Sequence, residues 1–219
     1  MDVESQRATV SVRPGRHTEL DAIVSWHLQH FSEGFFARLG PRFLKQNYAT
    51  LLGSPAGYLM VAELDGVPVG YVAGTTDAVA HRRHVMQTAR GRLAALGALA
   101  LARRPQLAWL FLRRRALVYA RKLLLSRQLT LPGTPVQVGT LDQLVVDPRA
   151  QHRGAGSLLL TSAVDEATRA GASRLELVTE AGSSVGEKFY QPAGWVRSGS
   201  SRDRDGRVLE RWVLRLPSA

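Results

Sequence analysis

The run Leu144-Val145-Val146-Asp147-Pro148-Arg149-Ala150-Gln151-His152-Arg153-Gly154-Ala155-Gly156-Ser157-Leu158 carries the strongest local signal in the chain. An apolar strand pattern ends at Asp147-Pro148, a turn containing two glycines follows, and an apolar helical pattern begins at once. The first N–H groups of a helix have no intrahelical acceptor, and the helix dipole adds partial positive charge there. This run therefore predicts a strand, a turn able to bind phosphate, and a helix.

Three residues of the turn favour a phosphate ligand. Gly154 and Gly156 have no Cβ to obstruct a diphosphate, and Arg153 adds a cation. The simpler interpretation is a loop that caps a helix and binds nothing. Two common phosphate-binding motifs do not fit: no acidic residue stands where dinucleotide-binding folds contact the ribose, and the chain has no Gly-Lys-Ser or Gly-Lys-Thr.

The elements before this turn predict strands on both sides of a helical region. Apolar spacing from His17 to Leu52 is helical and indicates two helices separated at Gly40-Pro41. Asp65-Gly66 is typical of a tight turn between antiparallel strands. The strands predicted on this side are Thr9–Arg13, Tyr58–Leu64 and Val67–Thr75.

The elements around and after the turn alternate between strand and helix. Strands are expected at Pro135–Val146, Ser173–Val178, Val196–Ser200 and Val208–Leu216, with helices at Gly154–Ala170 and Ser183–Gln191. Asp205-Gly206 marks a second hairpin turn. Alternation of this kind predicts a mixed α/β fold with a central sheet, and 219 residues suit a single domain.

The segment between Asp77 and Asp142 contains twelve arginines and lysines and no acidic residue. These twelve charges account for the whole net charge of +11. Because its leucines recur at helical intervals, the segment predicts two or three basic helices. We interpret residues 78–134 as a helical insertion in one domain spanning residues 1–219.

Composition excludes several kinds of site. The chain has no cysteine, which rules out disulfides, thiolate zinc ligands and a cysteine nucleophile, and its six histidines form no complete metal site. The polar N-terminal residues show no secretion signal, so we expect a cytoplasmic protein. The apolar run Leu93–Ala102 is too short to span a bilayer.

Two motifs together resemble the bacterial N-acyltransferases of the GNAT superfamily. The first is Gln151-His152-Arg153-Gly154-Ala155-Gly156, which is similar to the pyrophosphate motif of that family. The second is Phe189-Tyr190-Gln191-Pro192-Ala193-Gly194-Trp195, which is similar to its late helix. The order of the other elements agrees with the family nearly everywhere outside residues 78–134.

The resemblance implies a GNAT fold, with a mostly antiparallel mixed sheet whose middle strands splay apart, and acetyl-CoA or another acyl-CoA as donor. It implies no metal. It gives two catalytic residues, Tyr190 as general acid and Asp142 as base, with Glu63 and Glu33 as other candidates for the base. It also implies a set of residues that bind the coenzyme: Leu144, Val145, Val146, Gln151, His152, Arg153, Gly154, Ala155, Gly156, Ser157 and Ser183. Ser183 stands where many relatives have asparagine.

The function implied is transfer of an acyl group, foremost acetyl, to a primary amine. The basic segment favours a small anionic acceptor, such as an amino sugar or a nucleotide-linked amino sugar. Acetylation of protein N-termini or lysines is the alternative, and a non-catalytic module that binds acyl-CoA or a membrane surface is another. Residues 78–134 are also compatible with a lid, a homodimer contact, an anionic membrane surface or an acidic carrier protein, whereas few aromatics argue against nucleic acid.

Overall fold

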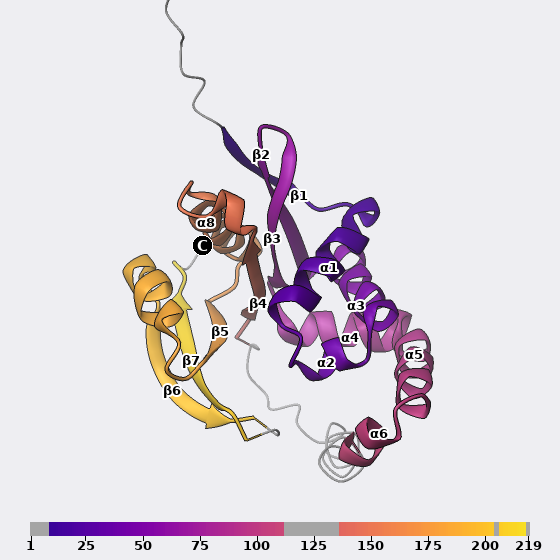
Figure 1. The fold of residues 1–219 in the computed structure, drawn as a ribbon. Coiled ribbons are helices and arrows are strands. Elements are labelled where there is room, and N and C mark those ends of the chain that lie inside the picture. Colours follow the sequence, from indigo (N-terminus) through magenta and orange to yellow (C-terminus); the bar gives the residue numbers. More distant parts are fainter. Residues whose placement is uncertain (1–8, 112–135, 204–205, 218–219) are drawn as a thin grey trace, which may run out of the picture.

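A computed structural model describes residues 9–111, 136–203 and 206–217 (Figure 1). A seven-stranded sheet forms its centre, in the order β1-β2-β3-β4-β5-β7-β6. Within the described residues, β4 and β5 form the one parallel pair and all other neighbours are antiparallel. The mixed, mostly antiparallel sheet predicted from the sequence is thus confirmed. The strands are β1 (Val10–Pro14), β2 (Gly57–Leu64), β3 (Val67–Thr75), β4 (Val138–Val146), β5 (Arg174–Glu180), β6 (Val196–Arg202) and β7 (Val208–Arg215).

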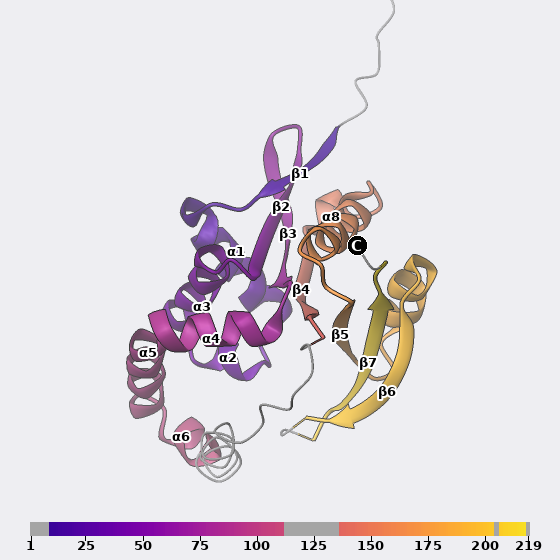
Figure 2. The ribbon, with the colours of Figure 1, turned by 180° about the vertical axis from the view of Figure 1, so that it is seen from behind.

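Helices cover the two faces of the sheet (Figures 1 and 2). On one face lie α1 (Leu20–His30) and α3 (Pro41–Gly53), whose apolar side chains form a core with Val61, Tyr71 and Val145 of the sheet. On the other face α8 (Ala155–Arg169) packs into a second core. Alternate residues of each strand enter the two cores, as the pleat of a sheet requires.

The helical region before β2 has one more break than the sequence predicted. The break at Gly40-Pro41 is present, but the first of the two predicted helices is itself divided. A 3-10 turn (His17–Glu19) precedes α1, and α2 (Phe35–Arg38) is a separate helix. The second break follows from the backbone at Gly34, which is extended with ψ 143° and cannot continue a helix.

Three described helices occupy the basic segment, namely α4 (Ala78–Thr88), α5 (Arg90–Ala102) and α6 (Pro105–Phe111). Asp77 begins α4, because its carboxylate accepts hydrogen bonds from the amides of Val79 and Ala80 at 2.9 and 3.0 Å. Helix α5 packs through Leu93 and Leu96 on Phe43 of α3. The rest of the predicted helical segment, residues 112–134, lies outside the described residues. No helix in the described ranges is long and apolar enough to cross a membrane.

The hairpin between β2 and β3 is as predicted, with Asp65 and Gly66 at φ 52° and 79°. The helix predicted over Ser183–Gln191 is not regular. The chain instead forms a π-helical turn, η4 (Gly186–Tyr190), followed by a 3-10 turn, η5 (Gln191–Ala193). Gly186 begins this turn in close contact with Trp212, because a Cβ there would lie 2.4 Å from the Trp212 ring.

Candidate active site

The turn between β4 and α8 is shaped by its own side chains and by two left-handed residues. One 3-10 turn, η3 (Pro148–Ala150), follows β4, and Asp147 caps it by accepting the amide of Arg149 at 2.8 Å. The Arg149 side chain also binds this carboxylate, which lowers the pKa of Asp147 to about 2. His152 and Gly154 then adopt φ of 61° and 85°, which turns the chain so that α8 begins at Ala155.

The first turn of α8 presents unpaired amides. Gly154 is the N-cap and offers no side chain to the helix. Among the described residues, no protein group accepts a hydrogen bond from the amides of residues 152–157. The neighbouring Gln151, His152 and Arg153 are exposed, as are Gly154 and Ser157. This arrangement suits a bound anion, because the unpaired donors and the positive end of the helix dipole coincide.

Gly156 leaves room beside this turn. A Cβ there would lie 3.4 Å from the Phe189 ring and 3.7 Å from Cγ2 of Val146. A side chain would therefore fill the space between α8, β4 and η4. Ala155, by contrast, is buried against the core at 1% exposure and fixes the start of the helix.

The parallel pair β4 and β5 separates along its length. The strands pair only at Val138, Gly139 and Thr140, opposite 174–176, although β4 continues to Val146 and β5 to Glu180. The other edge of β4 stays paired with β3 up to Val146. One edge of residues 141–146 therefore faces no strand within the described structure, and it opens toward the turn before α8. This confirms the predicted splay of the middle strands.

A bulge in β4 lies where the splay begins. Gly74 of β3 pairs with Leu141 and Ala73 pairs with Gln143, so Asp142 has no partner across the pair. A bulge of this kind bends a strand and re-aims the side chains around it. Beyond the bulge, Leu144 and Val146 pack toward α8, whereas Val145 is buried on the α1 and α3 side.

The Asp142 carboxylate sits in an unusual environment. Solvent reaches the side chain, yet surrounding protein atoms raise the pKa of Asp142, an effect that the Thr140 hydroxyl opposes. Desolvation by the surrounding protein therefore acts on a carboxylate whose side chain is still in contact with solvent. A carboxylate with a raised pKa is a better proton acceptor than an ordinary one.

Tyr190 ends the π-helical turn η4 and is 7% exposed. Its ring meets Phe189 and Trp195 edge to face, at centroid distances of 5.1 and 5.8 Å. Burial raises the pKa of Tyr190 to about 12, so the phenol is protonated at neutral pH and can donate its proton. Its hydroxyl has no hydrogen-bond partner in the part of the chain that the structure describes.

The two catalytic candidates come together around Tyr58. Burial raises the pKa of the Tyr58 phenol, and Asp142, Tyr190 and Glu166 all lie close enough to contribute to that shift. The sequence did not single out Tyr58. The sequence feature that could have indicated Tyr58 is Gly74, because a glycine inside a strand pattern marks a place where another group approaches the backbone closely.

Ser183 lies on the loop that joins β5 to η4. Its hydroxyl accepts a hydrogen bond from the amide of Val185 at 3.3 Å, and its own amide donates to Glu180. The side chain thus supports the turn that precedes η4. Its proton is available to a ligand, because that bond uses the oxygen as acceptor only.

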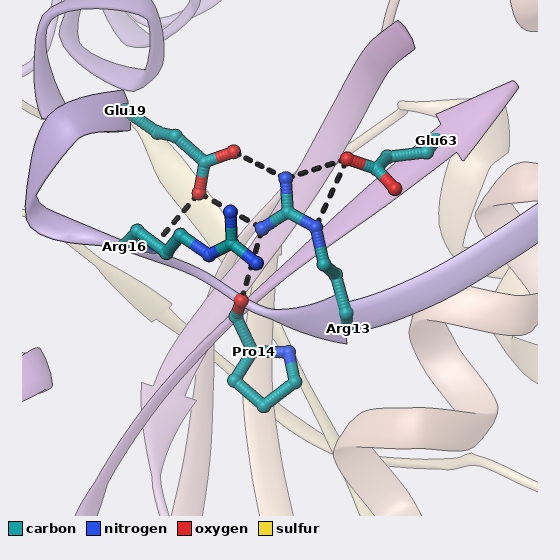
Figure 3. A network of polar contacts seen from close by, with 5 residues as sticks. All are labelled: Arg13, Pro14, Arg16, Glu19 and Glu63. Atoms are coloured by element: carbon teal, nitrogen blue, oxygen red, sulfur yellow. Dashed lines mark hydrogen bonds and ion pairs between the residues drawn. The ribbon is translucent and has the colours of Figure 1, made fainter. Parts of the chain in front are cut away.

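The other carboxylates considered for the base are engaged elsewhere. The guanidinium of Arg13 contacts both Glu19 and Glu63, at 2.6 and 2.5 Å, and ties β1 to β2 (Figure 3). Glu33 pairs with Arg38 at 3.0 Å on the surface. Neither Glu63 nor Glu33 accompanies Asp142 and Tyr190 around Tyr58. No group of metal-binding side chains occurs in the described ranges.

Comparisons with known proteins agree with this geometry. The sequence profile described as the acetyltransferase (GNAT) family matches residues 119–195, which include the turn, β4, α8 and Tyr190. A search of curated proteins gives no match.

Solved structures share the fold over nearly the whole chain. Ard1 from Thermoplasma volcanium superposes with a TM-score of 0.59 at 10% identity, covering 95% of this chain and 99% of the other. The ribosomal-protein-S18-alanine N-acetyltransferase from Escherichia coli gives 0.54 at 14% identity, with 96% of each chain covered. An acetyltransferase from Salmonella typhimurium, solved with acetyl-CoA, gives 0.53 at 16% identity, covering 96% of this chain and 95% of the other.

The profile match over residues 119–195 and the shared fold make this chain similar to the GNAT acetyltransferases, one of which was solved with the acyl donor acetyl-CoA. The residues present fit that donor. The unpaired amides of residues 152–157 suit its diphosphate, and the unpaired edge of β4 suits the amide groups of its pantetheine arm.

Proposed function

We propose that the protein is an N-acetyltransferase that moves an acetyl group from coenzyme A to a primary amine on a small anionic acceptor. An amino sugar or a nucleotide-linked amino sugar has this chemistry. The observation that carries the proposal is the separation of β4 from β5 beside a glycine turn with unpaired amides.

On the donor side, the proposal assigns binding to backbone and glycine. The amides of 152–157 would hold the diphosphate, with Arg153 and Gln151 beside it. The unpaired edge of Leu144 and Val146 would bind the pantetheine arm and orient the thioester carbonyl. Ser183 would add one hydrogen bond from its hydroxyl.

In the transfer step, the acceptor nitrogen bonds to the thioester carbon and the carbon–sulfur bond breaks. The amine must lose protons, and Asp142 would take one directly or through water, helped by its raised pKa. The sulfur leaves as a thiolate, and Tyr190 would give it the phenolic proton. Proton exchange with water then restores both groups.

The preference for an anionic acceptor rests on charge. Six arginines lie in the described part of the basic segment, and none of them pairs with a carboxylate there: Arg82, Arg83, Arg90, Arg92, Arg103 and Arg104. Helix α4 contacts β4, the strand that carries Asp142. Unpaired cations near a site attract anions, and salt weakens that attraction.

Acetylation of a protein amine is the second candidate. It is favoured by the E. coli enzyme named above, which acts on ribosomal protein S18, and by a ribosomal-protein-alanine N-acetyltransferase from Brucella melitensis with a TM-score of 0.56. Another similar structure is described as a phosphinothricin N-acetyltransferase, so the shared fold does not choose the acceptor. We also propose that residues 1–219 form one domain with a helical insertion at residues 78–134.

The deciding experiment measures thiol release from acetyl-CoA against a panel of amino sugars, nucleotide-linked amino sugars, amino acids and N-terminal peptides, followed by the mass of the product. We expect an acetylated anionic small molecule whose KM rises with ionic strength. An acetylated peptide would favour the second candidate. Binding of acetyl-CoA without turnover on any acceptor would contradict the enzyme assignment.

The donor site has a matched pair of glycines for its test. Gly154 and Gly171 lie at opposite ends of α8 with φ of 85° and 77°, and neither has an atom within 4 Å of a Cβ position. Gly154→Ala and Gly171→Ala therefore impose similar backbone strain. We expect calorimetry to show weaker coenzyme A binding for Gly154→Ala alone. Equal affinities in the two variants would contradict the assignment of the turn.

A further inference from the structure

The side chain of Tyr58 extends from β2 across β3 and reaches β4. It lies on β2, opposite Gly74 of β3, and its hydroxyl donates to the backbone carbonyl of Thr140 on β4 at 2.9 Å. The side chain is 4% exposed and belongs to the core beneath α8. A single phenol thus links β2 to the strand that carries the bulge.

Gly74 makes this crossing possible. A Cβ there would lie 2.1 Å from the Thr140 carbonyl oxygen and 2.5 Å from the Tyr58 hydroxyl oxygen. Any other residue would have to push both groups aside. The glycine, the phenol and the carbonyl therefore form one contact, which we call the Tyr58 lock.

The lock sits where β4 stops pairing with β5. Thr140 is the last residue of β4 that pairs with β5, and the bulge at Asp142 follows it by two residues. A bulge leaves part of the ladder without its regular hydrogen bonds. Tyr58 supplies a donor to the carbonyl at this junction.

We propose that Tyr58 is a positioning residue for acyl transfer, whose bond to the Thr140 carbonyl holds the β4 bulge and so fixes Asp142 and the unpaired edge at residues 141–146. This role rests on the proposed function. Tyr58 touches neither the coenzyme nor the acceptor in this role; it acts through β4.

The pKa of Tyr58 is raised, which keeps its hydroxyl a hydrogen-bond donor. Burial raises the pKa of the Tyr58 phenol, and the carboxylates of Asp142 and Glu166 add to this effect, so that all favour the neutral, protonated form. A phenol held neutral remains a hydrogen-bond donor at every working pH. The bond to Thr140 therefore persists while Asp142 gains and loses its proton.

The test compares Tyr58→Phe with Tyr71→Phe. Both remove only a buried hydroxyl, and Tyr71 bonds Tyr48 at 2.8 Å on the opposite face of the sheet. For Tyr58→Phe we expect kcat to fall about tenfold or more while KM for acetyl-CoA stays within about twofold. Tyr71→Phe should keep the wild-type kcat.

Amide hydrogen exchange tests the Tyr58 lock without requiring catalytic turnover. Exchange at residues 141–144 should quicken in Tyr58→Phe and stay unchanged in Tyr71→Phe. Gly74→Ala, which keeps the phenol but displaces it, should reproduce the Tyr58→Phe result. Wild-type exchange and wild-type kcat in either Tyr58→Phe or Gly74→Ala would overturn the lock. A wild-type protein without turnover would instead refute the proposed function, and the exchange comparison would still decide on the lock.

Discussion

The buried histidine of α1 gives a quantitative prediction of stability against pH. His27 is 6% exposed, and its Nδ1 lies 2.7 Å from the Tyr48 hydroxyl, which in turn lies 2.8 Å from that of Tyr71. Burial lowers the pKa of His27 from 6.5 to about 4. The imidazole therefore stays neutral in the folded protein at a pH where the unfolded chain is already protonated.

The direction in which pH changes the free energy of unfolding follows from the number of protons that His27 binds in the folded and unfolded chains. Between pH 6.5 and pH 4 the unfolded chain binds more protons at this residue than the folded one, so the free energy of unfolding falls as the pH falls. Each pH unit corresponds to about 1.36 kcal/mol, which gives about 3.4 kcal/mol over the whole window. About 2.4 kcal/mol of this is lost between about pH 7 and about pH 4.5.

The assay is denaturant unfolding at several pH values for the wild type and His27→Asn. Asparagine offers a polar atom near the Nδ1 position and does not titrate. We expect the pH-dependent loss to shrink by about 2.4 kcal/mol in this variant, whatever its absolute stability. His17→Asn, on an exposed histidine, is the control. If His27→Asn lost as much stability on acidification as the wild type, the burial argument would be wrong.

Three further predictions concern catalysis and binding. Tyr190→Phe should lower kcat about a hundredfold with little change in KM for acetyl-CoA, and unchanged thiol release would remove Tyr190 from the mechanism. Because the pKa of Asp142 is raised, the acidic limb of kcat/KM against pH should lie above the usual carboxyl range and disappear in Asp142→Asn; a retained limb would dismiss Asp142 as the base. Gly156→Val should fill the space beside Phe189 and weaken coenzyme A binding about tenfold in calorimetry, and an unchanged affinity would show that the ligand does not use that space.

Local chemistry explains what the sequence predicted well. The Asp65-Gly66 hairpin, the break at Gly40-Pro41 and the start of α8 after Gly154 depend on φ angles that neighbouring residues specify. The central sheet with helices packed on it followed from alternating strand and helix patterns. The turn before α8 could likewise be predicted from the sequence, because its glycines and its position after a strand are features of adjacent residues.

Tertiary contacts explain what the sequence did not predict. The late helix is a π-helical turn in which Gly186 packs on Trp212, a residue of the last strand. The splay of β4 from β5 came from the family resemblance and not from any pattern in either strand. A register shift at Asp142 lies where the splay begins, and it involves residues of β3 far away in the sequence.

Glycines within the strand patterns were the feature of the sequence that marked the bulged region of β3 and β4. Read locally, a glycine weakens a strand. In the structure, a Cβ on Gly70 would lie 2.4 Å from the Val145 carbonyl oxygen, and one on Gly139 would lie 2.6 Å from that of Thr75. With Gly74, these residues bring β3 and β4 closer than side chains would permit, and they do so on both sides of the bulge. The glycines thus mark the segment where backbone contacts, and not side chains, set the geometry of the candidate site.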